Sequence, residues 1–221
     1  MVSTNDAPPS QVLAEKRVSL YDISWETYET ISTALGDRSS PRLTYYRGTL
    51  EIMAPSEPHE SASSLIGTFL EILTEELDLT LKSLASTTLN RPDLKVGAEP
   101  DKCYYIQNEP LVRGRTVNLE TDPPPDLVIE VDITHTDINK KSLYEQMGVR
   151  EFWRYNGRTL TLYLLQDNQY QDVQTSPTFP WVQKETLYRF LNDCNEQGET
   201  QTKQAFRNWV REQISLLGTN G

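Results

Sequence analysis

Hydrophobic residues recur at helical spacing in three segments of the chain. The clearest segment covers residues 59–78, where apolar side chains return every three or four positions. A shorter stripe over residues 24–35 follows Ser24, a candidate N-cap, and ends before Gly36. Residues 203–217 carry a third stripe. The pattern predicts three amphipathic helices, each with one buried face.

Runs rich in β-branched and aromatic residues predict strands elsewhere. Residues 42–53 are expected to form a hairpin around Arg47-Gly48, and Asn156-Gly157 gives the strongest hairpin signal in the chain. Further strands are predicted over residues 81–89 and 99–106 and near Tyr170, and residues 107–125 are expected to form a long loop that closes with three prolines.

The strand predicted over residues 126–133, DLVIEVDI, alternates between apolar and acidic positions. Glu130 and Asp132 share one face and lie about 7 Å apart along the strand. Two carboxylates this close repel each other unless positive charge lies between them. A half-exposed antiparallel strand with one solvated face explains the same pattern. The strand alone therefore leaves both interpretations open.

The helix expected next begins near residues 134–137, ends at Met147 and places Lys140 on its apolar stripe. The spacing from Lys140 to Leu143 and Met147 is that of one helix face. Because the helix begins within a few residues of the strand, Lys140 can reach back to the carboxylate of Glu130 or of Asp132. The alternative is snorkelling, in which the lysine buries its stem and keeps its ammonium group in water.

The composition narrows the class of protein. With 221 residues, 37% of them hydrophobic, the chain fits a flexible polar arm over residues 1–18 and a single domain over residues 19–221. No stretch approaches the roughly 18 apolar residues of a membrane helix, and no secretory signal is visible. The two cysteines, Cys103 and Cys194, suit a reducing compartment. We expect a cytoplasmic protein without a membrane partner.

Charge and histidine content constrain the chemistry. Only two histidines occur, His59 and His135, so a three-histidine metal site within one chain is excluded. Any metal would be held mostly by carboxylates, which favour Mg²⁺, Mn²⁺ or Ca²⁺. The net charge of -11 argues against non-specific coating of nucleic acid, but not against an enzyme that uses a local basic patch. His59 is expected to be a helix cap or a surface residue.

Two more acids are candidates for a site. Asp101 follows Pro100 at a predicted strand, and Glu60 lies in the first turn of the long helix. Turn formation explains Asp101, and the helix dipole explains Glu60, without any function. Together with Glu130 and Lys140, however, they suit metal-assisted hydrolysis, in which carboxylates hold Mg²⁺ beside a phosphodiester and a lysine orients water. Glycosidases also use carboxylate pairs, but without an inward lysine.

Several runs resemble one family. PPPDLVIEVDIT and NKKSLYEQMGVREFWRYNG resemble the Uma-two family of restriction-endonuclease-like proteins, and YYRGTLEIMAPSEPHE and EPDKCYYI fit it in the same order, over roughly residues 20–175. This family belongs to the PD-(D/E)XK nuclease superfamily. The resemblance implies an α/β fold with a restriction-endonuclease-like mixed β-sheet core flanked by helices, with added β-hairpins. It also implies hydrolysis of DNA that depends on Mg²⁺ (or Mn²⁺).

The resemblance also suggests roles for individual residues. Asp101 resembles the first superfamily carboxylate and Glu130 the acid of the (D/E)XK element, and both are implied to be catalytic and to bind metal. Glu60 resembles the helix acid that assists metal binding. The superfamily lysine would stand where this chain has Asp132, so Lys140 resembles a migrated catalytic lysine. Asp126 belongs to the same motif and is expected to serve the start of the strand.

The leading hypothesis is therefore a metal-dependent endodeoxyribonuclease. The alternative is a catalytically inactive relative that acts as a dimeric binding or regulatory module, which the net charge and Asp132 favour. No residue selects a third interpretation, a hydrolase of another phosphodiester or of a sugar. A homodimer interface could form from the exposed hairpin edges and from three tryptophans, Trp153, Trp181 and Trp209. The tryptophans fit the core of a monomer equally well.

Overall fold

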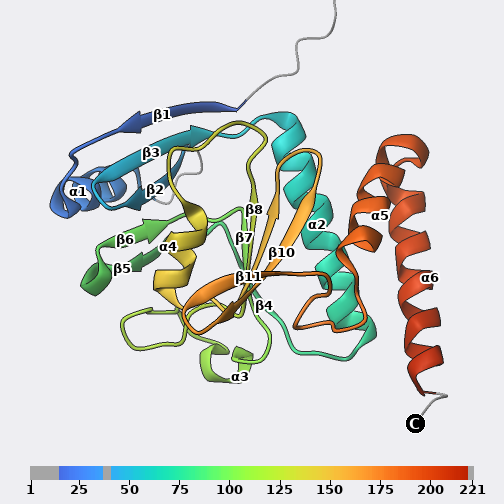
Figure 1. The fold of residues 1–221 in the computed structure, drawn as a ribbon. Helices are drawn as coiled ribbons and strands as arrows, with labels where there is room; N and C mark the ends of the chain where they lie inside the picture. The colour runs from blue at the N-terminus through green and yellow to red at the C-terminus, as the bar shows by residue number, and fades with distance from the viewer. Residues whose placement is uncertain (1–14, 37–40, 219–221) are drawn as a thin grey trace, which may run out of the picture.

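The computed structural model describes residues 15–36 and 41–218, which form two β-sheets and the helices around them (Figure 1). The first sheet has the order β1-β3-β2-β6-β5 and is antiparallel throughout. Its strands are β1 (Lys16–Leu20), β2 (Arg42–Tyr46), β3 (Thr49–Ala54), β5 (Leu89–Arg91) and β6 (Val96–Ala98).

The second sheet has the order β11-β10-β9-β8-β7-β4 and is mixed, because β8 and β9 run parallel while their other neighbours are antiparallel. Its strands are β4 (Lys82–Ala85), β7 (Lys102–Tyr105), β8 (Leu127–Val131), β9 (Glu151–Tyr155), β10 (Leu160–Gln166) and β11 (Gln169–Val173). The helices are α1 (Trp25–Leu35), α2 (Glu57–Glu76), α3 (Glu109–Val112), α4 (Lys140–Met147), α5 (Lys184–Gln197) and α6 (Glu199–Gly218).

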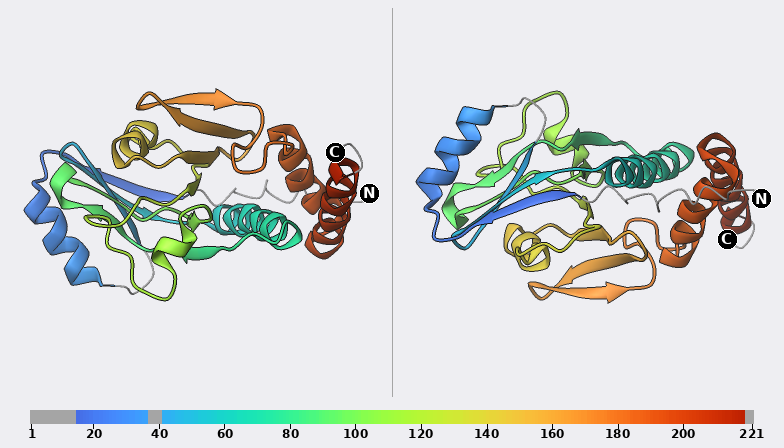
Figure 2. Two further views of the ribbon diagram at one scale, coloured as in Figure 1. Left: turned by 90° about the horizontal axis from the view of Figure 1, so that it is seen from below. Right: turned by 90° about the horizontal axis from the view of Figure 1, so that it is seen from above.

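Helices cover both faces of the second sheet. On one face, α2, α5 and α6 close a core that contains Ile129, Trp153 and Phe206. On the other face, α4 packs Tyr144 against Phe152, with ring centroids 5.2 Å apart. The first sheet is covered by α1, which lies at the end of the molecule opposite α5 and α6 (Figure 2).

The three helices predicted from apolar stripes are confirmed as α1, α2 and α6. The Ser24 hydroxyl caps α1 by accepting a hydrogen bond from Thr27 N at 3.1 Å. The hairpins at Arg47-Gly48 and Asn156-Gly157 are confirmed as β2–β3 and β9–β10, and the strand near Tyr170 as β11. Periodicity and turn residues are local signals, so these elements could be found from the sequence alone.

Other elements differ from the prediction. The strand predicted over residues 81–89 is two strands, β4 and the start of β5, in different sheets. The loop over residues 107–125 contains α3, and α5 was not predicted. Of the arm predicted over residues 1–18, residues 1–14 lie outside the described part, and Lys16 begins β1.

The start of α4 also differs. It was expected near residues 134–137, but the helix begins after Asn139, whose side chain accepts a hydrogen bond from Ser142 N at 3.2 Å. Backbone N–H groups of the preceding segment instead donate to the carboxylates of Glu15 and Glu51. These contacts with the first sheet hold the segment out of the helix.

The tryptophans are part of the chain's own core. Trp153 is fully buried, and the rings of Trp181 and Trp209 lie 5.4 Å apart on the same hydrophobic cluster. Across the described ranges, no helix has the length and apolar content needed to cross a bilayer.

Candidate active site

Lys140 connects the two acids of strand β8. Its Nζ lies 2.6 Å from Glu130 Oε2 and 2.9 Å from Asp132 Oδ1. All three residues are at most 4% exposed. The solvated-face interpretation of the strand is therefore wrong, because β7 and β9 flank β8 and α4 covers the acidic face. Snorkelling is excluded for Lys140, whereas Lys141 lies over the Tyr163 ring.

The charges of this group stabilise one another. Burial lowers the pKa of Lys140, but Asp132 and Glu130 outweigh this effect and raise it, so the ammonium group stays protonated. Burial raises the pKa of Asp132, but Lys140, Arg154 and Arg17 outweigh it and lower the pKa. Arg154 Nε contacts Asp132 Oδ2 at 3.0 Å. Asp132 and Lys140 are thus buried charges that their neighbours hold in the ionised form.

Tyr144 is a member of the site that the sequence analysis did not identify. It lies one helical turn after Lys140 on α4, and its hydroxyl donates to Glu130 Oε1 at 2.5 Å. Burial raises the pKa of Tyr144 well above its usual value, and the negative charge of Glu130 raises it further. The phenol stays protonated, so both oxygens of Glu130 accept hydrogen bonds. The shared apolar stripe was the available signal.

Asp101 reaches the end of strand β8 from just before β7. Its Oδ2 accepts a hydrogen bond from Val131 N at 2.5 Å, so its carboxylate lies beside the residue that follows Glu130. Its Oδ1 contacts His59 Nε2 at 2.7 Å and forms an ion pair with Arg42. Two predicted site acids, Asp101 and Glu130, therefore lie at the same end of neighbouring strands.

His59 has a different environment from the one expected. It is fully buried in the first turn of α2, and its Nδ1 lies 2.5 Å from Glu15 Oε1. With Asp101 on its other ring nitrogen, His59 joins two carboxylates. Burial would raise the pKa of Glu15, but His59, Thr134 and Arg17 lower it well below its usual range. The expectation of a cap or surface residue is wrong because Glu15 supplies the second partner.

Glu60 lies apart from the other predicted site residues. Its side chain is 51% exposed, and its Oε1 accepts a hydrogen bond from Arg42 at 2.8 Å. Arg42 also pairs with Asp101, so the arginine lies between the two acids. The sequence-predicted group therefore splits into a buried set, Asp101, Glu130 and Lys140, and a surface acid.

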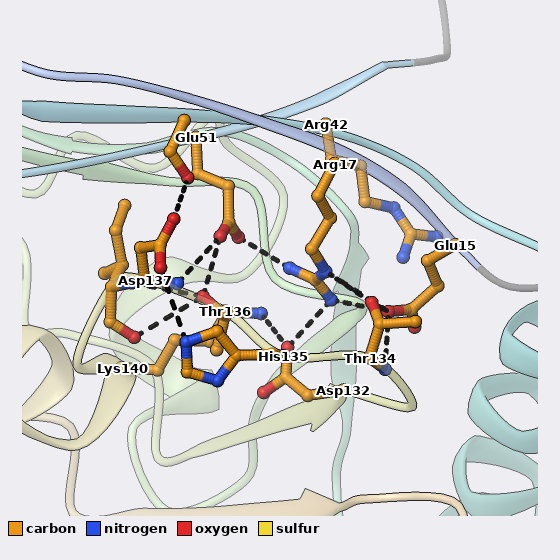
Figure 3. Close-up of polar contacts among 12 residues, drawn as sticks. Glu15, Arg17, Arg42, Glu51, Asp132, Thr134, His135, Thr136, Asp137 and Lys140 are labelled. Carbon is orange, nitrogen blue, oxygen red and sulfur yellow. Dashed lines mark hydrogen bonds and ion pairs between the residues drawn. The ribbon is translucent and has the colours of Figure 1, made fainter.

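Strand β1 contributes residues to the cluster that sequence reasoning missed (Figure 3). Arg17 contacts Glu51 Oε1 at 2.5 Å and Asp132 Oδ1 at 3.0 Å, and its Nε donates to the Thr134 hydroxyl at 3.0 Å. The Glu15 carboxylate accepts hydrogen bonds from the N–H and hydroxyl groups of Thr134. These contacts tie β1 to the loop that leads from Asp132 into α4.

Asp126 is held in another way, at the start of β8. Its Oδ2 accepts hydrogen bonds from Ile106 N at 2.7 Å and Asn108 N at 2.9 Å, and its Oδ1 from Asn108 Nδ2 at 2.7 Å. This geometry anchors the chain after β7, in line with the structural role expected for Asp126.

The donor set fits a hard cation that is shared with a substrate. Within residues 15–36 and 41–218, no three or more His, Cys, Asp or Glu side chains are arranged to hold a metal ion together. Mg²⁺ commonly needs only one or two carboxylates, completed by water and substrate phosphates. Asp101 and Glu130 could supply those oxygens, in competition with Arg42 and Lys140, which contact the same carboxylates.

Comparisons with known proteins agree with this architecture. A crystal structure described as "a putative nuclease belonging to DUF820 from Anabaena variabilis ATCC 29413" is 14% identical and covers 76% of this chain and 98% of its own, with a TM-score of 0.51. The likeness confirms the restriction-endonuclease-like α/β fold. No curated protein matches the chain. The Uma2 family model, described as "Putative restriction endonuclease", matches residues 25–191. Since that match spans most of the sequence, the chain belongs to the Uma2 family.

Proposed function

We propose that this chain is a metal-dependent DNA endonuclease that hydrolyses phosphodiester bonds by a PD-(D/E)XK-type mechanism. The observation that carries the proposal is the position of Lys140, 2.6 Å from Glu130 and 2.9 Å from Asp132, with Asp101 bound to the end of the same strand. Family membership supports nuclease chemistry.

The residues have distinct roles in this proposal. Asp101 and Glu130 hold Mg²⁺ or Mn²⁺, and Glu60 assists from the surface beside Arg42. When bound, the ion would polarise the phosphoryl oxygen and lower the pKa of a water molecule. Lys140 orients the attacking water and stabilises charge at phosphorus. The water oxygen bonds to phosphorus and loses a proton to solvent as the bond to the leaving oxygen breaks, and the leaving oxygen takes up a proton from solvent.

A second candidate is a catalytically inactive relative that serves as a dimeric binding or regulatory module. It is favoured by the contacts of the three buried acids, since every carboxylate oxygen of Asp101, Glu130 and Asp132 already accepts from a cation, a hydroxyl or a backbone N–H. In this alternative, the arginines and the lysine lock the edge of the sheet. Light scattering measures the molar mass in solution, and the mass of a monomer would rule out the dimeric state in this alternative.

The experiment that separates the two candidates is a calorimetric titration of Mg²⁺ and Mn²⁺ into the wild type and Glu130→Gln, with plasmid nicking assayed on the same samples. The nuclease proposal predicts saturable binding and nicking, both lost in the variant. Glu151→Gln is the matched control, because Glu151 is also buried and lies at the other end of the parallel strands. Absence of metal binding and nicking in the folded wild type would favour the inactive relative.

A further inference from the structure

An open groove of about 650 Å³ lies outside the carboxylate cluster. One wall is the β2–β3 turn with Arg47, and the residues before β6 add Lys95. The opposite wall is the outer face of α4, with Glu145, and the β10–β11 turn, with Asn168. The groove therefore lies between strand ends of the first sheet and the α4 side of the second sheet, and its volume lies within the usual range of ligand pockets.

The two cations of this groove lack acidic partners at short range. Within the described part of the chain, neither Arg47 nor Lys95 has a carboxylate oxygen within 4.0 Å, and both are exposed. Lys95 interacts with Glu26 only through longer-range electrostatics. The guanidinium carbon of Arg47 lies 5.1 Å from the Tyr46 ring centroid. The acid in the lining, Glu145, accepts a hydrogen bond from a backbone N–H. The groove can therefore receive an anion.

A second groove, of about 570 Å³, has three basic residues, but each of them already has a partner within the protein. Its Arg113 pairs with Glu109 at 2.6 Å, and its Arg115 pairs with an aspartate at 2.6 Å. The ammonium group of Lys82 donates to backbone carbonyls, one of them that of Val112 at 2.7 Å. Since these cations are already bound within the protein, the first groove is the better receptor for phosphate.

The first groove is connected to the candidate active site by two shared elements. Strand β2 begins with Arg42, which pairs with Asp101, and leads directly into Arg47. Five residues of extended strand span roughly 17 Å. Helix α4 presents Lys140 to the carboxylates and Gln146 to the groove. Because one strand of a duplex has a phosphate every 3.4 Å along its axis, this separation corresponds to about five base pairs.

We propose that Arg47 and Lys95 bind the phosphate backbone of the DNA duplex that flanks the cleaved bond. The inference rests on the proposed nuclease function. The groove offers positive charge but no exposed Tyr46 face for base stacking, because that residue is only 7% exposed and its ring lies beneath the guanidinium group, which favours contact with phosphates. It supplies the local basic patch that a chain with a net charge of -11 needs in order to hold DNA.

The test is fluorescence anisotropy with a labelled 20-base-pair duplex in the presence of Ca²⁺, at several salt concentrations. The proteins are the wild type, the double variant Arg47→Ala with Lys95→Ala, and the control Arg189→Ala. Arg189 is also exposed and lies 4.8 Å over the ring of Phe190, but on α5, away from the groove. The double variant is expected to bind about tenfold more weakly, and the slope of log Kd against log salt to fall by roughly 1.8, at about 0.9 per phosphate contact.

The control should bind within about twofold of the wild type. If the wild type binds DNA and the double variant matches its affinity and salt slope, the groove proposal is overturned and the nuclease proposal stands. If the wild type binds no DNA although it is folded, both proposals fail. Equal losses of DNA affinity in the double variant and in Arg189→Ala would indicate a general effect of charge, and would also overturn the groove proposal.

Discussion

Two pairs of buried carboxylates lie at opposite ends of the parallel strands β8 and β9, and they are stabilised in different ways. Near the starts of the strands, Asp126 and Glu151 accept hydrogen bonds from neutral groups. At the end of β8, Glu130 and Asp132 contact Lys140, and Asp132 also contacts two arginines. The two ends of these strands thus show two solutions to the same problem of burying negative charge.

At the starts of the strands, the hydrogen bonds of Glu151 serve to hold the chain together. The carboxylate of Glu151 accepts hydrogen bonds from Trp153 Nε1 at 2.6 Å, Ser176 Oγ at 2.7 Å and Thr178 Oγ1 at 2.6 Å. These donors belong to β9 itself and to the segment after β11, so they fix that segment to the sheet. Burial raises the pKa of Glu151 by more than the hydrogen bonds lower it.

At the other end, the carboxylates of Glu130 and Asp132 are bound by cations, and these cations can change partners. A neutral N–H or hydroxyl donor brings no positive charge, whereas a lysine or arginine that transfers its contact to an incoming phosphate also offsets the phosphate's negative charge. A cation that leaves a carboxylate for a phosphate also frees an oxygen for a metal ion. The comparison therefore assigns the proposed chemistry to Glu130 and Lys140 and not to Glu151.

The largest effect should come from removing the shared cation. Lys140→Met leaves Glu130 and Asp132 buried without the ammonium group between them, so we expect the free energy of unfolding to fall by about 3–5 kcal/mol. Cleavage should fall by about 10³-fold at a temperature where the variant is folded. Urea unfolding and nicking measure the two losses. Lys141→Met removes only an ammonium group that lies over the Tyr163 ring, so it should cost at most about 1 kcal/mol and leave cleavage unchanged. Cleavage by Lys140→Met at the wild-type rate would contradict the proposed role.

A smaller loss of stability is expected at the neutral end. Glu151→Ala leaves the donors of Trp153, Ser176 and Thr178 without their acceptor, at a cost of about 2–3 kcal/mol for buried groups that lose hydrogen bonds. The cleavage rate of the folded variant should stay within about twofold of the wild type, because these donors do not reach the other end of the sheet. Urea unfolding measures the loss of stability and plasmid nicking measures the rate. A large loss of activity without a loss of stability would contradict the structural role of Glu151.

Strand β1 should have an intermediate influence on the charged end. Arg17→Gln removes the positive charge that joins Glu51 to Asp132, so the loop into α4 is expected to loosen. We expect a loss of about 1–2 kcal/mol in stability and of about tenfold in kcat. Arg17→Lys should recover part of the kcat, because the charge is restored. If kcat is unchanged in Arg17→Gln, the loop does not depend on β1.

The smallest expected effect concerns pH. The pKa of Glu151 in the folded protein lies above its ordinary value of 4.5. The folded state therefore holds the proton more tightly, and the resulting stability is full below about pH 4.5 and is lost as pH rises through the raised pKa. The stability of the wild type relative to Glu151→Gln should decrease over that range, as measured by urea unfolding. A difference that increases with pH would contradict the assigned direction.

Local patterns revealed part of this site. The stripe on α4 predicts that Lys140 faces the strand because the phase of a helix is set by residues three and four apart. Glu130 could be found from the pattern along its strand, and the family resemblance suggested both Asp101 and Glu130 as site acids. The family resemblance gave the fold.

The remaining contacts could not be read from the sequence. Arg17 meets Asp132 across 115 residues of chain, and β1 is only five residues long, too short for a clear alternating pattern. His59 resembles an ordinary residue of a first helical turn, and its buried partner Glu15 lies just before that strand. Such contacts join segments that are far apart in the sequence, so no local period reports them.

The most direct test of the central assignment is single-turnover nicking of plasmid DNA in Mg²⁺ by Glu130→Gln and Glu151→Gln, side by side. Both changes neutralise one buried carboxylate on neighbouring strands, and both variants are first shown to be folded by circular dichroism. The predicted result is a rate about 10³-fold below the wild type for Glu130→Gln and within about twofold of it for Glu151→Gln. Full cleavage by a folded Glu130→Gln would contradict the assignment, as would equal losses in both variants.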